Sequence, residues 1–403
     1  GQTMQKIETN KFIDNTISLR RMLPLTKETV TTLNLMALMI KARSEKYPTR
    51  DQLQEAMSLA YGLISSFAIS GYGGKVLLDY RFRFIRPELI ESEDYIEQIL
   101  ELMDQVLFHP LFSEEGLQEA KYILENKLIS MEAEPDSQAL LKALSVSQPE
   151  GSPITIAMQG YRQDIEKITL TDIRKAYEEF CTLPFEILVV GDIDPRILEW
   201  LDSMEQTSWK YDASILASPQ PVRHETIEMN VSSCSLVQVY RTGIGPRDPL
   251  AFALLTANSI LGASPMSMLF EEVREKHSLC YRISSSLIRF DGALLISTGT
   301  QQENLDKVRE LIAREIEKLK KGEFADSLLE SAKLDLQDSI LAQQDHPSSL
   351  LAQSFLNSFL EREMSSQEML DAIGSVTREK VMEAAAGIEM LCSACVMSKE
   401  VTE

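Results

Sequence analysis

The feature that most constrains this fold is an internal duplication of the chain. The run LAYGLISS at 59–66 is matched by LCYRISSS at 279–286, which places two tyrosines 220 residues apart. Further along, Glu119-Ala120-Lys121 is matched by Ser331-Ala332-Lys333 at an offset of 212. Because the matches keep their order, we expect two homologous halves, with an eight-residue insertion or deletion at 86–95 between them.

A helix-breaking stretch marks the boundary between the halves. Residues 218–221 read Ser-Pro-Gln-Pro, and two prolines so close together favour an extended linker. We therefore predict an N-terminal domain at 1–208, a linker at 209–221 and a C-terminal domain at 222–403. In a chain of 403 residues each half is long enough to bury its own core.

Both halves predict the same order of elements: a strand, a helix, two strands, two long helices and a closing strand. The predicted strands lie at 16–25, 63–70, 75–85 and 185–191, and at 235–242, 282–290, 293–300 and 390–397. The predicted helices lie at 50–59, 91–107 and 114–132, and at 250–261, 303–320 and 327–344. Turn signals at 71–74 and 291–292 indicate hairpins. The expected class is therefore α+β, with two duplicated domains that each layer helices on a mainly antiparallel sheet.

The charge balance argues against one class of partner. Lys and Arg number 40 against 61 Asp and Glu, a formal charge of −21. Such a surface repels a phosphate backbone, so we expect no nucleic-acid partner. The acidic charge could attract a basic peptide, although solubility alone is the favoured interpretation.

Cysteine usage and hydropathy indicate a reducing compartment. The five cysteines are widely spaced and odd in number, which argues against a disulfide framework. Cys392 and Cys395 have Cys-x-x-Cys spacing, but in the predicted last strand they would face opposite sides of the sheet. The stretch 1–15 lacks an apolar core, and no apolar run reaches the ~18 residues of a membrane span. We expect a cytoplasmic protein without a membrane partner.

One segment of the second half resembles a known family. Arg274-Glu275-Lys276 is followed by Leu279-Cys280-Tyr281, with Arg and Tyr seven residues apart. This segment is similar to the C-terminal domain of insulinase/pitrilysin-type peptidases and mitochondrial processing peptidase. The runs at 261–264 and 267–270 resemble that family's glycine-rich turn and Ser-Arg-Leu-Phe, with Met268 in place of the basic residue, and Val-Val-Gly-Asp at 189–192 also fits.

The resemblance implies that Arg274 and Tyr281 hold a substrate peptide. A guanidinium can donate two parallel hydrogen bonds to a carbonyl or carboxylate, and a phenol can donate to the carbonyl beside the scissile bond. The alternative is structural: Arg274 pairs with nearby acids, and Tyr281 fills the layer between sheet and helices.

The catalytic half of the family carries His-x-x-Glu-His, in which two histidines bind zinc and the glutamate activates water. With Lys46-Tyr47-Pro48 as the anchor, the resemblance places these positions at Asn34, Ala37 and Leu38, and a later ligand near Asn126. The four histidines, at 109, 224, 277 and 346, lie too far apart to form the motif anywhere. We therefore expect a member without catalytic residues or a metal of its own.

The resemblance favours a non-catalytic subunit of an insulinase-type zinc peptidase. A zinc-bearing homologue would be its partner in a heterodimer, although a homodimer is also open, and the substrate would be a peptide or protein. Similar bacterial proteins are associated with elongation-factor P modification. The alternative is a stand-alone peptide- or protein-binding pseudopeptidase. An active enzyme with an unfamiliar site is the weakest interpretation, because no other nucleophile or metal constellation is visible.

Overall fold

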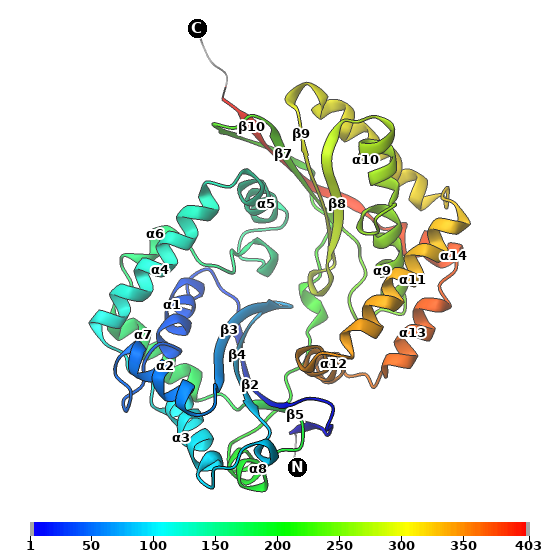
Figure 1. Ribbon diagram of the computed structural model, residues 1–403. Coiled ribbons are helices and arrows are strands. Elements are labelled where there is room, and N and C mark those ends of the chain that lie inside the picture. The colour runs from blue at the N-terminus through cyan, green and yellow to red at the C-terminus, as the bar shows by residue number, and fades with distance from the viewer. Residues whose placement is uncertain (1–3, 400–403) are drawn as a thin grey trace. The chain divides into compact units, whose positions relative to one another are not determined.

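The computed structural model describes residues 4–399 and divides the chain into two compact units, each with one sheet (Figure 1). The first unit comprises the residues up to Ile129 together with 158–211 and 343–363. The second comprises 130–157, 212–342 and the residues from Met364 onward. The predicted linker at 209–221 between the two repeats stays a prediction. The two units differ from the predicted sequence halves at two segments, 130–157 and 343–363.

The two five-stranded sheets have the same strand order. The first runs β1 (Gln5–Ile7), β5 (Glu186–Val190), β2 (Asp14–Pro24), β4 (Lys75–Ile85) and β3 (Ile64–Tyr72). The second runs β6 (Arg223–Met229), β10 (Glu389–Ser398), β7 (Cys234–Arg241), β9 (Ala293–Thr300) and β8 (Cys280–Ile288). Among the described strands, β1 with β5 and β6 with β10 are parallel and the other pairs antiparallel. The predicted α+β class with mainly antiparallel sheets is confirmed.

Tight hairpins join the paired strands at the predicted turns. Gly73 and Gly74, between β3 and β4, have φ values of 53° and 84°. Two consecutive positive φ values are what a two-residue type I′ hairpin requires, and glycine adopts them without strain. Gly292, before β9, has a φ of 62°. These turns fix the register of β3 on β4 and of β8 on β9.

Helices cover both sheets. The first unit has α1 (Val30–Ile40), α2 (Arg50–Leu59), α3 (Tyr95–Phe108), α4 (Glu114–Glu132), α6 (Arg162–Ile165), α7 (Leu170–Cys181) and α8 (Pro195–Asp202). The second has α9 (Ala251–Asn258), α10 (Leu305–Lys320), α11 (Asp326–Gln343), α13 (Ser366–Gly374), α14 (Arg378–Ala385) and the π-helical segments η4 (Ser259–Ala263) and η5 (Phe270–Lys276). Single 3₁₀ turns lie at 87–89, 153–155, 213–215, 289–291 and 302–304. Within residues 4–399 no helix combines the length and apolarity of a bilayer span.

Each half of the chain contributes one helix to the unit that is formed mainly by the other half, and we call these two helices, α5 and α12, the exchanged helices. Helix α5 (Pro135–Val146) belongs to the second unit, where Ala139 and Ala143 are buried in the same apolar cluster as Val237 and Val239 of β7. Helix α12 (Pro347–Phe359) belongs to the first unit and packs on β5 and β1. Both helices begin with proline at the first helical position. Small side chains on α5 allow close packing on the sheet.

The structure supports one of the two repeat offsets and corrects the other. Lys121 and Lys333, 212 residues apart, donate equivalent hydrogen bonds to Glu166 O at 3.0 Å and Val376 O at 3.1 Å. At the start of the first hairpin, however, the Leu63 N–H donates to Met57 O, and the Leu279 N–H donates to Val273 O. The structural offset there is 216, so the matching tyrosines at 61 and 281 are not equivalent.

Candidate functional site

Helix α1 carries the three positions where the resemblance places the zinc motif. Asn34 is buried, and its Nδ2 donates to Val30 O at 2.8 Å and to Met158 O at 2.9 Å. Ala37 is buried and Leu38 is half-buried. The Asn34 carboxamide is already hydrogen-bonded to two carbonyl oxygens, and Ala37 and Leu38 have hydrocarbon side chains. Such a set of side chains does not form a zinc site. These residues do not fit the metal.

The fourth position, Asn126, lies on the exposed side of α4. Glu119 on the same helix forms ion pairs with Arg43 at 2.6 Å and Arg50 at 2.5 Å. Burial favours a higher pKa for Glu119, but its hydrogen bonds to the two guanidinium groups outweigh that effect and lower the pKa. This carboxylate is therefore already bound by two arginines. Residues 4–399 contain no group of three His, Cys, Asp or Glu side chains arranged to hold a metal ion.

Arg274 lies in η5 and is exposed to solvent. Its guanidinium lies 4.9 Å from the centroid of the Phe270 ring, one turn earlier, so the face of an aromatic ring supports the charged group. No carboxylate of the described chain forms an ion pair with Arg274. The neighbouring acid, Glu272, instead contacts His277 at 3.2 Å and Lys276 at 3.5 Å. Arg274 therefore has free hydrogen-bond donors.

Tyr281 is displayed by a β-bulge. The pairing of β8 with β9 shifts register between Cys280 and Arg282, so Tyr281 is the extra residue of the bulged strand. Its side chain is 55% exposed, and its hydroxyl lies 3.5 Å from Ser233 Oγ. The phenol lies over Gly299 of β9, where a Cβ would come within 2.3 Å of the hydroxyl oxygen. The absence of a side chain at Gly299 makes room for the tyrosine.

A carboxylate from α5 holds the next residue of β8. Asp136 forms an ion pair with Arg282 and accepts a hydrogen bond from Ser235 Oγ at 2.6 Å. The Arg282 guanidinium lies 5.9 Å from the centroid of the Tyr281 ring. The exchanged helix α5 is therefore part of the surroundings of Tyr281.

Cys280 lies between the two predicted substrate-binding residues in the chain. Burial raises its pKa, and the positive charges of Arg274 and Arg282 oppose that rise. Both guanidinium groups are therefore near enough to Cys280 to act on its charge, and Cys280 directly precedes Tyr281. The structure gathers Arg274, Tyr281 and Arg282 at one end of β8, and it pairs only Arg282 with an acid.

Some of the residues around Tyr281 could not be identified from the sequence. Arg282 follows the family-like segment directly, but its partner Asp136 is 146 residues away in the chain. Gly299 carries no functional group, and only the three-dimensional proximity of Tyr281 shows its role. The bulge at Tyr281 leaves no residue pattern that distinguishes it from a regular strand.

The Cys-x-x-Cys pair is structural. Cys392 and Cys395 are buried in β10 and belong to different apolar clusters, as expected for residues on opposite faces of a strand. Burial raises the pKa of Cys392 to about 11 and that of Cys395 to about 12. Thiols that stay protonated on opposite faces form neither a metal knuckle nor a redox pair.

Comparison with known proteins finds that the chain is similar to peptidase-like proteins. The family model described as "Peptidase M16 inactive domain" matches residues 167–336. The chain is 22% identical over 402 residues to the "Probable inactive metalloprotease YmfF" of Bacillus subtilis, covering 97% of this chain and 94% of that protein. It is 22% identical over 300 residues to the "Uncharacterized zinc protease YmxG" of the same organism, covering 72% of each. A crystal structure of a conserved protein from Enterococcus faecalis matches 99% of this chain and 97% of its own, with a TM-score of 0.93 at 22% identity.

Proposed function

Because the chain belongs to the insulinase-type (M16) peptidase family as an inactive member, we propose that it is the non-catalytic subunit of a zinc peptidase. In this proposal a zinc-bearing homologue supplies the metal, and this chain contributes Arg274 and Tyr281 to the binding of a peptide substrate. The pair works in the cytoplasm.

The exposed, unpaired guanidinium of Arg274 is the observation that carries the proposal. A surface arginine in a chain with a net charge of −21 has many possible acidic partners, yet Arg274 pairs with none in the described chain. The hydroxyl of Tyr281, a residue that is 55% exposed, adds a second donor seven residues further along the chain. Two exposed donors of this kind suit the carbonyl oxygens of an extended peptide.

The need for a partner follows from the residues at the degenerate motif. Asn34, Ala37 and Leu38 can neither hold zinc nor transfer a proton, so hydrolysis requires another chain. YmxG, a relative of this chain, is named a zinc protease, and a homologue of that kind would supply the metal. Without such a partner, the same two donors would serve a stand-alone peptide-binding protein.

The test is a variant series in the reconstituted pair. We expect Arg274→Ala and Tyr281→Phe to reduce kcat/KM for a peptide substrate by about ten-fold or more, because each removes a charged or phenolic hydrogen bond. Lys276→Ala is the matched control, since Lys276 is exposed on the same η5 segment. Wild-type rates in both variants, with assembly unchanged, would overturn the substrate-binding role.

A further inference from the structure

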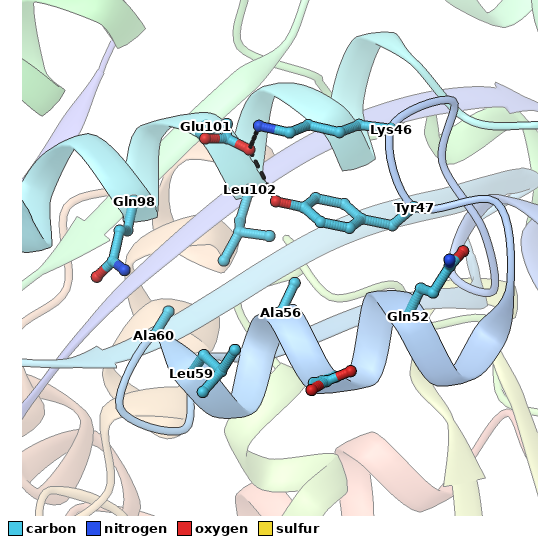
Figure 2. A pocket seen from close by; sticks show the side chains of 10 residues that line it. Lys46, Tyr47, Gln52, Ala56, Leu59, Ala60, Gln98, Glu101 and Leu102 are labelled. Atoms are coloured by element: carbon cyan, nitrogen blue, oxygen red, sulfur yellow. Dashed lines mark hydrogen bonds and ion pairs between the residues drawn. The ribbon is translucent and has the colours of Figure 1, made fainter.

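A pocket of about 460 Å³ lies between α2 and α3 in the first unit (Figure 2). None of the degenerate motif positions lines it, and it involves no residue of the Arg274 segment. Its volume is in the range of small-ligand sites, which is roughly 300–1,000 Å³. The pocket is therefore separate from the residues proposed for peptide cleavage.

Part of the pocket lining is apolar. Ala56 on α2 and Ala60 directly after its end face Leu102 of α3, and Leu59 completes this surface (Figure 2). Leu59 is 68% exposed, an unusual position for leucine. The two alanines leave open the space that larger side chains would fill. This apolar part of the lining suits the methylene chain of a ligand.

One end of the pocket is built around Glu101. Its Oε1 accepts hydrogen bonds from Lys46 Nζ and, at 2.8 Å, from the Tyr47 hydroxyl. Both bonds go to the same oxygen (Figure 2), so Oε2 keeps its lone pairs. The bond from Lys46, together with that from Tyr47, lowers the pKa of Glu101 against the opposing effect of burial, so the carboxylate is ionised at neutral pH.

A second acceptor lies one turn earlier on α3. Gln98 extends from α3 toward α2 (Figure 2), and its buried Oε1 accepts no hydrogen bond from the described residues. A buried amide oxygen without a donor is destabilising, because it has lost its hydrogen bonds to water. Rotation about the terminal bond of the side chain turns this oxygen to the pocket, where a ligand N–H can supply the missing bond.

The charge of the pocket is negative. Glu55, which also lines it, adds a second carboxylate to that of Glu101, against the single positive charge of Lys46. The formal charge of the lining is therefore −1, in a chain whose net charge is −21. Such a site attracts cations and repels anions.

The polar end of the pocket is held rigidly. The Lys46 N–H donates to Gln105 Oε1 at 3.0 Å, and the Tyr47 N–H donates to Ser44 Oγ at 3.2 Å. Thr49 then starts α2 with a capping box that includes Gln52. Because both ends of this short segment are fixed, Lys46 and Tyr47 hold Glu101 in place before any ligand arrives.

From this arrangement we propose that the pocket binds a basic group on a short aliphatic stem, an alkylammonium or a guanidinium. The charged end pairs with Glu101 Oε2, Gln98 Oε1 and Glu55, and the stem lies along Ala56, Leu59 and Leu102. The group can come from a free amine or from a lysine or arginine side chain of a peptide. This site is additional to the proposed peptidase subunit role and does not depend on it.

The test is a titration of the isolated full chain, with no partner and no cleavage assay. The probes are Nα-acetyl-lysine amide, Nα-acetyl-arginine amide and cadaverine, with Nα-acetyl-norleucine amide as the uncharged analogue. We expect the basic probes to bind with Kd below about 10 mM and at least ten-fold more tightly than the norleucine probe. Tighter binding of cadaverine would indicate a free amine as the source, and tighter binding of the blocked residues would indicate a peptide.

Variants locate the binding. Glu101→Gln removes the charge, and Ala56→Leu fills the space with a good helix former; each should weaken the best basic probe about ten-fold or more. Glu97→Gln is the matched control, because Glu97 is an exposed acid of α3 outside the pocket. Unchanged melting temperatures exclude unfolding as the cause. Equal affinity for lysine and norleucine probes, or full affinity in Ala56→Leu, would overturn the proposal.

Discussion

The hydroxyl of Tyr281 lies 2.3 Å from the point where a Cβ on Gly299 would be. Real side chains do not approach each other so closely, so the glycine and the displayed tyrosine depend on each other. The bulge between Cys280 and Arg282 brings the phenol over the strand at this point. Gly299 is therefore a positioning residue for the candidate substrate-binding surface.

Substitution of Gly299 should move Tyr281 without unfolding the second unit. We expect Gly299→Ala to displace the phenol and to reduce kcat/KM of the reconstituted pair about as much as Tyr281→Phe does. Ser297→Ala on the same strand is the control. The measurements are peptide cleavage by the pair and the melting temperature of the chain. A fully active Gly299→Ala variant would show that the position of Tyr281 is immaterial.

The metal content of the purified chain tests the assignment of the degenerate motif. We expect less than one zinc per chain by elemental analysis, because Asn34, Ala37, Leu38 and Asn126 include no histidine, cysteine or carboxylate. The purified zinc-bearing homologue provides the positive control. Zinc that stays bound one-to-one after dialysis against a weak chelator would contradict the loss of the site.

Glu186 should make the stability of the first unit depend on pH. Burial raises the pKa of this carboxyl from 4.5 to about 7, although the Trp209 N–H and the charge of Arg20 oppose the rise. The folded chain then holds this proton more tightly than the unfolded chain. Its stabilising effect is complete below about pH 4.5 and is lost as the pH rises through about 7.

Glu186→Gln removes this titration. We expect the variant to match the wild type near pH 5 and to be more stable by about 1–3 kcal/mol near pH 8, measured by urea unfolding. Asp192→Asn, on an exposed acid just beyond the same strand, is the control. A wild-type pH profile in Glu186→Gln would contradict the assignment of the titration to this group.

The exchanged helix α12 should be essential to the stability of the first unit. Phe355 is fully buried, stacks on Phe359 with ring centroids 5.3 Å apart, and lies 4.7 Å from the Arg20 guanidinium. We expect Phe355→Ala to destabilise the chain by about 3–5 kcal/mol, because it leaves a cavity and an arginine without its ring.

The control for Phe355→Ala is Leu341→Ala, which removes an apolar side chain that is 50% exposed on α11. We expect this variant to change the free energy of unfolding by about 0.5 kcal/mol or less. Equal losses in the two variants, measured by denaturant unfolding, would show that α12 adds little to the first unit.

Much of the fold is predictable from local patterns. Alternating apolar residues, hairpin glycines and amphipathic repeats predict the four longer strands of each half, and α4 begins and ends at the predicted residues. These signals depend on neighbours in the sequence. The short strand β1 is missed because only three residues form it, and its parallel partner β5 lies about 180 residues later in the chain.

The unit to which each exchanged helix belongs and the exact repeat alignment are not predictable in this way. The apolar face of α12 shows that the helix is buried, but not which of two similar sheets it covers. The offset of 220 fails because it aligns matching tyrosines, whereas the backbone hydrogen bonds of Leu63 and Leu279 set the equivalence. Likewise Asp136, Arg282 and Gly299 gather around Tyr281 only after the chain folds.

The most direct test of the proposed subunit role is a reconstitution. A zinc-bearing homologue from the same genome is assayed against a mixed peptide pool, alone and with this chain added. We predict cleavage only when both chains are present, with its loss when the zinc is chelated. Cleavage by the homologue alone, at a rate that this chain does not change, would contradict the role of a non-catalytic subunit.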